Sequence, residues 1–281
     1  MDKIINVKNI LNQEIEKLKQ RIKNLKEKGI TPRFAVIIAN TLESTKIYVR
    51  NKKKLATDMG IIMDEYILEE NVDNNDVISL IKRLNEDDNV HGILLQLPLF
   101  NHLNENTLLE VISKDKDIDC FNPYNLGKVF IGDAKIYPCT PKGIMTILDS
   151  LGEDFTSKKA VVIGRSNIVG KPIASMLLKK NMTVTICHSK TKNLKEETQK
   201  ADVLICACGI PNYITKEYIK DGAIVIDVGI NRKDSKIVGD VDTEDCLEKV
   251  KYITKVPGGV GLMTVCSVMD NLCSLIEEKI K

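Results

Sequence analysis

Three polar side chains recur at intervals of four residues in the first third of the chain: Ser44, Tyr48 and Lys52. In a helix this spacing places them on one face. A tyrosine on such a face can stack on a planar ring, and a lysine one turn later can act on that ring as an acid, a base or a cationic anchor. Partial burial would lower the pKa of the lysine and make it a usable proton carrier. Because Lys52 begins a run of three lysines, its spacing alone favours an ordinary solvated helix face.

Further candidate groups follow in the chain. Gln96 lies at the carboxyl end of the predicted strand 90–97, and polar groups at the carboxyl end of a parallel strand lie where open α/β sheets bind ligands. Asp117 and Asp119 lie in a later segment, and either carboxylate could accept two hydrogen bonds from an aminopyrimidine edge. The alternative for each is a loop aspartate that bonds to its own backbone.

A glycine-rich loop precedes the last helical segment. Gly258, Gly259 and Gly261 predict close approach of the backbone to a ligand, and Thr264 is expected to cap the helix that follows.

The segment 161–172 has the pattern of a strand, a glycine-rich turn and a helix, with Gly164 and Gly170 in the turn. Such a turn can present free N–H groups to a phosphate, although it can also be a plain connection. In NAD sites a carboxylate is expected about 20 residues on, at the ribose hydroxyls. The strand 183–187 instead leads into Ser189 and Lys190. We therefore predict NADP rather than NAD, with Arg165 and Ser189 holding the 2′-phosphate, while Lys190 can equally be a solvated loop residue.

The elements that must position these residues alternate in type. After a first helix that ends near Gly29, the pattern predicts strands and helices in the order βαβαβ, and so a parallel sheet with outer helices. The predicted strands are 34–39, 61–68 and 90–97, and the helix that carries Lys52 is expected at about 44–58.

A second α/β region begins near Thr140 and Pro141, which are expected as the cap and first residue of a helix. The final helix, about 264–280, is expected to return to the first region. The sequence thus predicts an α/β protein with a three-layer catalytic domain, 1–139 plus 264–281, and a Rossmann-type NADP-binding domain, 140–263. The strands predicted in the second region are 160–163, 183–187, 203–207 and 223–228.

Composition limits the class of protein. The 281 residues favour two domains, and 43% hydrophobic with 28% charged residues is an ordinary globular balance. The formal charge of +2 gives no reason to expect nucleic acid or an anionic membrane as a partner. We expect no targeting signal and no membrane span, because no run of about 18 apolar residues is evident. The eight cysteines contain no C-x-x-C pair, which favours reduced thiols in the cytoplasm over disulfides or zinc.

Several motifs, in this order, resemble one family, the bifunctional methylenetetrahydrofolate dehydrogenase/methenyltetrahydrofolate cyclohydrolases. Cys120, Phe100 and Leu262 depart from the usual pattern of that family. The matching motifs are Tyr48-Val49-x-x-Lys52, Gln96-Leu97-Pro98-Leu99, Asp117-Ile118-Asp119 with Asn125-x-Gly127, Pro138-Cys139-Thr140-Pro141-Lys142-Gly143, Gly164-Arg165-Ser166-x-x-Val169-Gly170-x-Pro172, Asp227-Val228-Gly229-Ile230-Asn231, Gly239-Asp240-Val241-Asp242 and Pro257-Gly258-Gly259-Val260-Gly261.

The resemblance implies two reactions and no metal. Methylenetetrahydrofolate would give a hydride to NADP, and water would open the resulting methenyl cation to 10-formyltetrahydrofolate. It implies that Lys52 is the key cyclohydrolase group, that Gln96 tunes its protonation, that Tyr48 stacks on the folate and that Asp119 holds the pterin ring. A dehydrogenase-only relative and a non-catalytic NADP-binding module are the alternatives.

The resemblance also implies binding positions and a homodimer joined through the cofactor domains. The cofactor positions are Gly164, Arg165, Ser166, Ser189, Ile230 and Thr140. The substrate positions are Tyr48, Lys52, Gln96, Leu97, Pro98, Asp119, Gly259 and Leu262.

Overall fold

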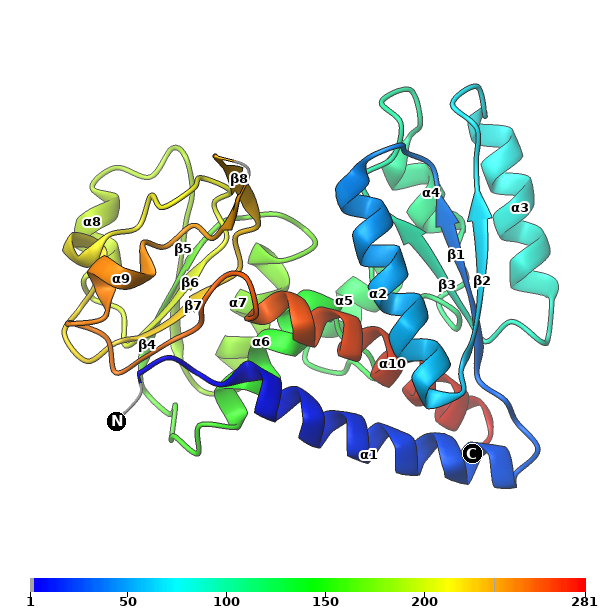
Figure 1. The fold of residues 1–281 in the computed structure, drawn as a ribbon, viewed down its shortest axis with the longest axis horizontal. Helices are drawn as coiled ribbons and strands as arrows, with labels where there is room; N and C mark the ends of the chain where they lie inside the picture. The colour runs from blue at the N-terminus through cyan, green and yellow to red at the C-terminus, as the bar shows by residue number, and fades with distance from the viewer. Residues whose placement is uncertain (1–2, 235) are drawn as a thin grey trace. The chain divides into compact units, whose positions relative to one another are not determined.

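In the computed structural model, which describes residues 3–234 and 236–281, the chain forms two compact units (Figure 1). The three-stranded unit comprises Glu14–Cys139 and Val265–Lys281, and the five-stranded unit comprises the residues up to Gln13 and Thr140–Thr264. The sequence-based division kept all of 1–139 together. In the structure the first residues instead extend the larger sheet, since the Ile5 amide donates to the Ile253 carbonyl at 2.8 Å.

The three-stranded unit has a parallel sheet of order β2-β1-β3, as the predicted βαβαβ pattern requires. The central strand β1 is buried from Phe34 to Ile38. Helix α3 begins with a capping box between Asp73 and Asp76, and α2 ends at Gly60, whose φ of 72° needs a glycine. The elements are α1 (Val7–Glu27), β1 (Arg33–Ile38), α2 (Glu43–Met59), β2 (Ile62–Ile67), α3 (Asn74–Glu86), β3 (Gly92–Gln96), α4 (Glu105–Val111) and α5 (Pro123–Phe130).

The five-stranded unit has a parallel sheet of order β10-β7-β6-β4-β5. The chain leaves β4 toward β5 on one side and returns to β6 on the other, so the strand order reverses between β4 and β6. Open α/β sheets bind ligands at the carboxyl ends of the strands beside such a reversal. The elements are α6 (Cys139–Asp149), β4 (Lys159–Ile163), α7 (Gly170–Lys179), β5 (Thr183–Cys187), α8 (Leu194–Thr198), β6 (Val203–Cys206), η1 (Lys216–Tyr218), β7 (Ile224–Asp227), the hairpin β8 (Asn231–Lys233) and β9 (Lys236–Val238), α9 (Thr243–Cys246) and β10 (Tyr252–Ile253).

The final helix, α10 (Val260–Lys279), starts earlier than predicted. Thr264 is therefore not its cap: it lies inside the helix, and its Oγ1 donates to the Val260 carbonyl at 3.3 Å. Helix α6 likewise begins at Cys139, one residue before the predicted cap Thr140.

Helix α10 also packs into the three-stranded unit, as predicted. The buried Asn271 donates from Nδ2 to the carbonyls of Ile118 (2.9 Å) and Tyr137 (2.7 Å). In the described part of the chain α10 alone is long and apolar enough to cross a membrane, but 61% of its apolar window is buried, as in a core helix.

Candidate functional site

The centre of the candidate site is a buried pair of polar side chains, Lys52 on α2 and Gln96 at the end of β3. Lys52 is only 5% exposed, on the face of α2 that packs inward with Val49 and Ala56. Its Nζ donates to Gln96 Oε1 at 2.7 Å. Gln96 Nε2 in turn donates to the Leu97 carbonyl at 2.9 Å, which orients the amide oxygen toward the lysine. Lys52 is thus not part of a solvated face, although its neighbours Lys53 and Lys54 are exposed.

The surroundings of Lys52 change its pKa. Burial lowers the pKa of Lys52, while the carboxylate of Asp119 and the thiol of Cys139 raise it again in part. Burial raises the pKa of Asp119, and Lys52 and Cys139 oppose that rise. An amine with a lowered pKa that interacts with a carboxylate with a raised pKa is better suited to exchange a proton with a bound molecule than either group is in water.

The structure separates the two aspartates that the sequence left as alternatives. Asp117 is buried and bonds to its own loop: its carboxylate accepts from the amides of Phe121 (3.1 Å) and Asn122 (2.9 Å) and from Asn125 Nδ2 (2.9 Å). Burial raises the pKa of Asp117 to about 6, against the effect of these bonds. Asp117 therefore shapes the segment, and Asp119 is the carboxylate that interacts with Lys52.

Tyr48 lies one turn before Lys52 on α2 and is half-buried, which raises the pKa of its phenol. Ser44, one turn earlier still, is exposed. Leu97 and Pro98 follow Gln96 directly, and the Pro98 carbonyl accepts from Asn40 Nδ2 at 2.6 Å. The structure thus gathers an aromatic side chain, an amine, an amide and a carboxylate within one unit.

The glycine-rich turn after β4, in the five-stranded unit, is a second candidate site. A Cβ on Gly164 would lie 2.4 Å from the Ala207 carbonyl oxygen, and a Cβ on Gly170 would lie 2.2 Å from the Gly164 oxygen. Larger residues therefore cannot replace either glycine without moving backbone. The turn lies where the strand order reverses, and α7 starts there at Gly170, so the positive end of the helix dipole lies at that edge of the sheet.

The side chains around this turn fit a dinucleotide with a phosphate on its ribose. Arg165 and Ser189 are both exposed, and Ser189 follows β5 in the position where NAD sites carry an acidic residue. Ser166 Oγ accepts from the amides of Val169 (3.1 Å) and Gly170 (3.3 Å), so this serine also holds the turn itself. NADP would be held by the turn and the first turn of α7, with Arg165 and Ser189 at the 2′-phosphate.

The remaining predicted positions lie in the five-stranded unit. Ile230 is exposed just after β7, and Thr140 Oγ1 lies 3.2 Å from Thr264 Oγ1. Leu262 is exposed in the first turn of α10. A Cβ on Gly259 would lie 2.5 Å from the Lys255 carbonyl oxygen, so the packing of the loop on itself already demands a glycine there.

Sequence reasoning missed Cys139 as a member of the site. Its buried thiol interacts with Asp119 and raises the pKa of Lys52, and it donates to the Ile118 carbonyl at 3.5 Å. The only sequence signal was its place beside Thr140 in a recognised motif.

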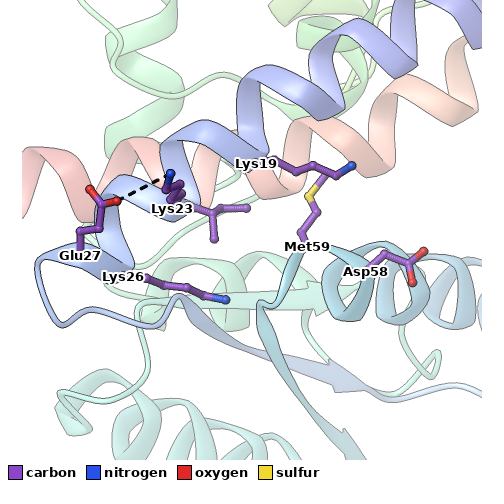
Figure 2. A pocket seen from close by; sticks show the side chains of 7 residues that line it. Lys19, Lys23, Lys26, Glu27, Asp58 and Met59 are labelled. Carbon is purple, nitrogen blue, oxygen red and sulfur yellow. Dashed lines mark ion pairs between the residues drawn. The ribbon is translucent and has the colours of Figure 1, made fainter.

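A separate cavity of about 430 Å³ opens on the three-stranded unit, between α1 and the end of α2 (Figure 2). Exposed lysines dominate it, and it contains none of the predicted site residues. A Cβ on Gly60 would lie 2.3 Å from Lys26 Nζ, so that ammonium lies at the carboxyl end of α2, where a cation is favourable. The lining residues are Lys19, Ile22, Lys23, Lys26, Glu27, Asp58 and Met59.

Comparison with known proteins gives consistent matches along the whole chain. Residues 5–119 match the family model described as tetrahydrofolate dehydrogenase/cyclohydrolase, catalytic domain, and residues 138–280 match its NAD(P)-binding domain. The chain is 47% identical over 270 residues to the bifunctional protein FolD of Acetivibrio thermocellus, covering 96% of this chain and 95% of that protein. The identity to FolD of Bacillus subtilis is 44% over 269 residues, covering 95% of each.

Solved structures of FolD proteins have the same fold as this chain. The bifunctional FolD of Campylobacter jejuni is 43% identical, with a TM-score of 0.95 and coverage of 98% of this chain and 99% of that one. The Trypanosoma brucei FolD, complexed with NADP cofactor and an inhibitor, is 32% identical, with a TM-score of 0.95 and coverage of 99% and 98%.

Proposed function

This chain belongs to the tetrahydrofolate dehydrogenase/cyclohydrolase family, and on that premise we propose how its residues perform the two reactions of a bifunctional enzyme. The enzyme oxidises 5,10-methylenetetrahydrofolate to the 5,10-methenyl form with NADP, and hydrolyses the methenyl form to 10-formyltetrahydrofolate. The observation that carries the assignment of the active site is the buried Lys52–Gln96 pair with Asp119 beside it.

In the hydrolysis, water adds to the cationic methenyl carbon, so a proton must leave that water and another must reach the ring nitrogen as the C–N bond breaks. Lys52 is suited to carry such a proton because burial has lowered its pKa. Gln96 holds the amine in place through the 2.7 Å hydrogen bond. Asp119 accepts hydrogen bonds from the pterin, and the half-buried Tyr48 stacks on the folate. Leu97, Pro98, Gly259 and Leu262 complete the proposed substrate contacts.

In the oxidation, NADP supplies the hydride acceptor. The chain's part is to bind and orient it: Gly164 and Ser166 form the turn at the phosphates, and Arg165 and Ser189 bind the 2′-phosphate. Thr140 and Ile230 complete the set of cofactor contacts, Ile230 through its backbone.

We propose a homodimer joined through the five-stranded unit. Strand β5 is an edge strand of its sheet, and Ile186 on it is 40% exposed. Leu178, near the end of the adjacent helix α7, is 63% exposed. An apolar edge of this kind is favourable when a second copy covers it. A cytoplasmic location is also proposed, because none of the eight cysteines forms a disulfide in the structure, which suits a reducing compartment.

The decisive experiment is Lys52→Met, measured with two assays. We expect it to reduce the hydrolysis rate of methenyltetrahydrofolate by at least about a hundredfold, the usual contribution of a proton-transfer group. Calorimetric titration should show that NADP binds as to the unmutated enzyme. A near-normal hydrolysis rate would contradict the role of Lys52.

The matched control is Lys53→Met. Lys53 is the next residue on α2, exposed, and its Nζ donates to Glu65 at 2.5 Å. We expect both activities of this variant within about twofold of normal, since exposed ion pairs contribute little. Following methenyltetrahydrofolate by absorbance, with NADP and with NAD, also separates the bifunctional enzyme from a dehydrogenase-only relative and from a non-catalytic binding module.

A further inference from the structure

Two buried carboxylates lie directly behind the proposed cofactor edge of the five-stranded sheet. Asp227 is the last residue of β7, and Asp240 follows β9. Both are almost fully buried. Neither has a role in the chemistry described above, so their burial requires another explanation.

Asp240 ties two loops together. Its Oδ2 accepts from the amides of Cys208 (2.7 Å) and Gly209 (3.0 Å), and its Oδ1 accepts from the Ile210 amide (3.1 Å). Oδ1 also accepts from Asn231 Nδ2 at 2.8 Å. One carboxylate thereby holds the loop after β6 and the start of β8 with four charge-assisted bonds.

Asp227 holds Asp240 in turn. Its Oδ1 accepts from the amides of Gly229 and Asp240, both at 2.9 Å, and its Oδ2 accepts from the Val241 amide at 3.0 Å. A Cβ on Gly239 would lie 1.8 Å from Asp227 Oδ2, and a Cβ on Gly229 would lie 2.3 Å from Asp240 Oδ1. The backbone therefore encloses both carboxylates and leaves them no other position.

The loops that Asp240 holds border the glycine-rich turn. Ala207 begins the first loop, its amide donates to the Ile163 carbonyl at 2.8 Å, and its own carbonyl oxygen is the atom that excludes a side chain at Gly164. The exposed Ile230 lies between Gly229 and Asn231, which are bonded to Asp227 and Asp240 respectively.

We infer that Asp240 is a positioning residue for NADP: by fixing the loop 207–210 and Asn231, it sets the shape of the cofactor edge without touching the reacting atoms. The inference rests on the proposed use of NADP.

The test is Asp240→Asn, which keeps the size of the side chain but turns an NH2 donor toward backbone amides that need an acceptor. We expect the NADP dissociation constant, measured by calorimetry, to rise about tenfold or more. The KM for NADP should rise in parallel, while hydrolysis of methenyltetrahydrofolate, measured without NADP, stays within about twofold because Lys52, Gln96 and Asp119 belong to the other unit.

The control is Asp242→Asn, two residues away, whose side chain accepts from the Asp245 amide and so caps the start of α9. Its NADP affinity should be unchanged. An unchanged NADP affinity in Asp240→Asn, or an equal loss of both activities, overturns the inference. If Asp240→Asn does not fold, Asn231→Ala can be used instead, because it removes one of the four hydrogen bonds to Asp240. We expect Asn231→Ala to bind NADP severalfold more weakly. An unchanged NADP affinity of Asn231→Ala would also overturn the inference. Failure of the unmutated enzyme to bind NADP would instead contradict the proposed cofactor.

Discussion

At the scale of single residues, burial changes what common side chains can do. Lys52 is the first of three consecutive lysines, yet it alone is buried and bonded to Gln96. Desolvation lowers its pKa, and the charge of Asp119 limits how far the pKa falls. The protonation of this site is therefore set by a balance of two opposing effects that can be separated by mutation.

We predict that Asp119→Asn lowers the pKa of Lys52 further. The mutation removes the negative charge that favours the ammonium form, so the neutral amine should predominate from a lower pH than in the unmutated protein. NMR titration of protein with isotopically labelled lysine measures this directly, with the Lys52 signal assigned by its loss in Lys52→Met.

Glu65→Gln is the control, because Glu65 accepts a hydrogen bond from Lys53 and not from Lys52. It should leave the titration of Lys52 unchanged. A Lys52 pKa that rises or stays constant in Asp119→Asn would show that Asp119 is not its electrostatic partner.

At the scale of elements, close contacts of the backbone explain the glycines at the proposed cofactor edge. Gly164 meets the loop after β6, and Gly170 meets Gly164 itself, so strand, turn and helix α7 approach one another without side chains between them. The glycines of this sequence motif are therefore the positions at which the packing of the backbone excludes a side chain. The same holds at Gly259, where a Cβ would lie 2.5 Å from the Lys255 carbonyl oxygen.

We therefore expect Gly170→Ala to destabilise the glycine-rich turn. The new Cβ would lie 2.2 Å from the Gly164 carbonyl oxygen, which forces backbone to move. We expect the free energy of unfolding to fall by about 1–3 kcal/mol, as for overpacking elsewhere, and NADP to bind more weakly. Denaturant titration and calorimetry measure the two effects.

Gly127→Ala is its counterpart in helix α5, where a Cβ would meet no atom within 4 Å. Alanine is the better helix former, so this variant should be as stable as the unmutated protein or slightly more so. Equal destabilisation by the two substitutions would refute the steric explanation for Gly170.

At the scale of the whole molecule, the two proposed activities draw on different parts of the chain. The buried lysine belongs to the three-stranded unit, and the nucleotide turn belongs to the five-stranded unit. The exposed apolar side chains of the proposed dimer interface, at the β5 edge, also belong to the five-stranded unit.

Ile186→Lys is expected to shift the protein from dimer toward monomer, because a charge at the centre of an apolar contact is costly to bury. Light scattering after size exclusion, at several protein concentrations, measures the change in mass. Phe130→Lys is the control: Phe130 is 82% exposed but belongs to the other unit, so the mass should not change. A monomeric unmutated protein, or a dimer that survives Ile186→Lys, would contradict the proposed interface.

The order and type of most elements could be predicted from local sequence patterns. Alternating apolar runs and amphipathic stretches predicted all three strands of the first sheet and four of the five in the second, because local periodicity reflects which face is buried. The short strand β10 and the hairpin β8–β9 were not predicted, because strands of two and three residues are too short to show a periodic pattern. The motifs were also sufficient to identify the family, which the comparisons confirmed.

Which polar residues are candidates for the active site became clear from the folded chain. Asp117 bonds within its own loop, whereas the burial of Lys52 and its interactions with Gln96, Asp119 and Cys139 depend on contacts between segments far apart in the chain. The same holds for Asp240, whose partners lie up to 32 residues away. A sequence states which groups are present, but the pKa of a group and the hydrogen bonds it makes depend on the dielectric and the donors around it, and those exist only once the chain has folded.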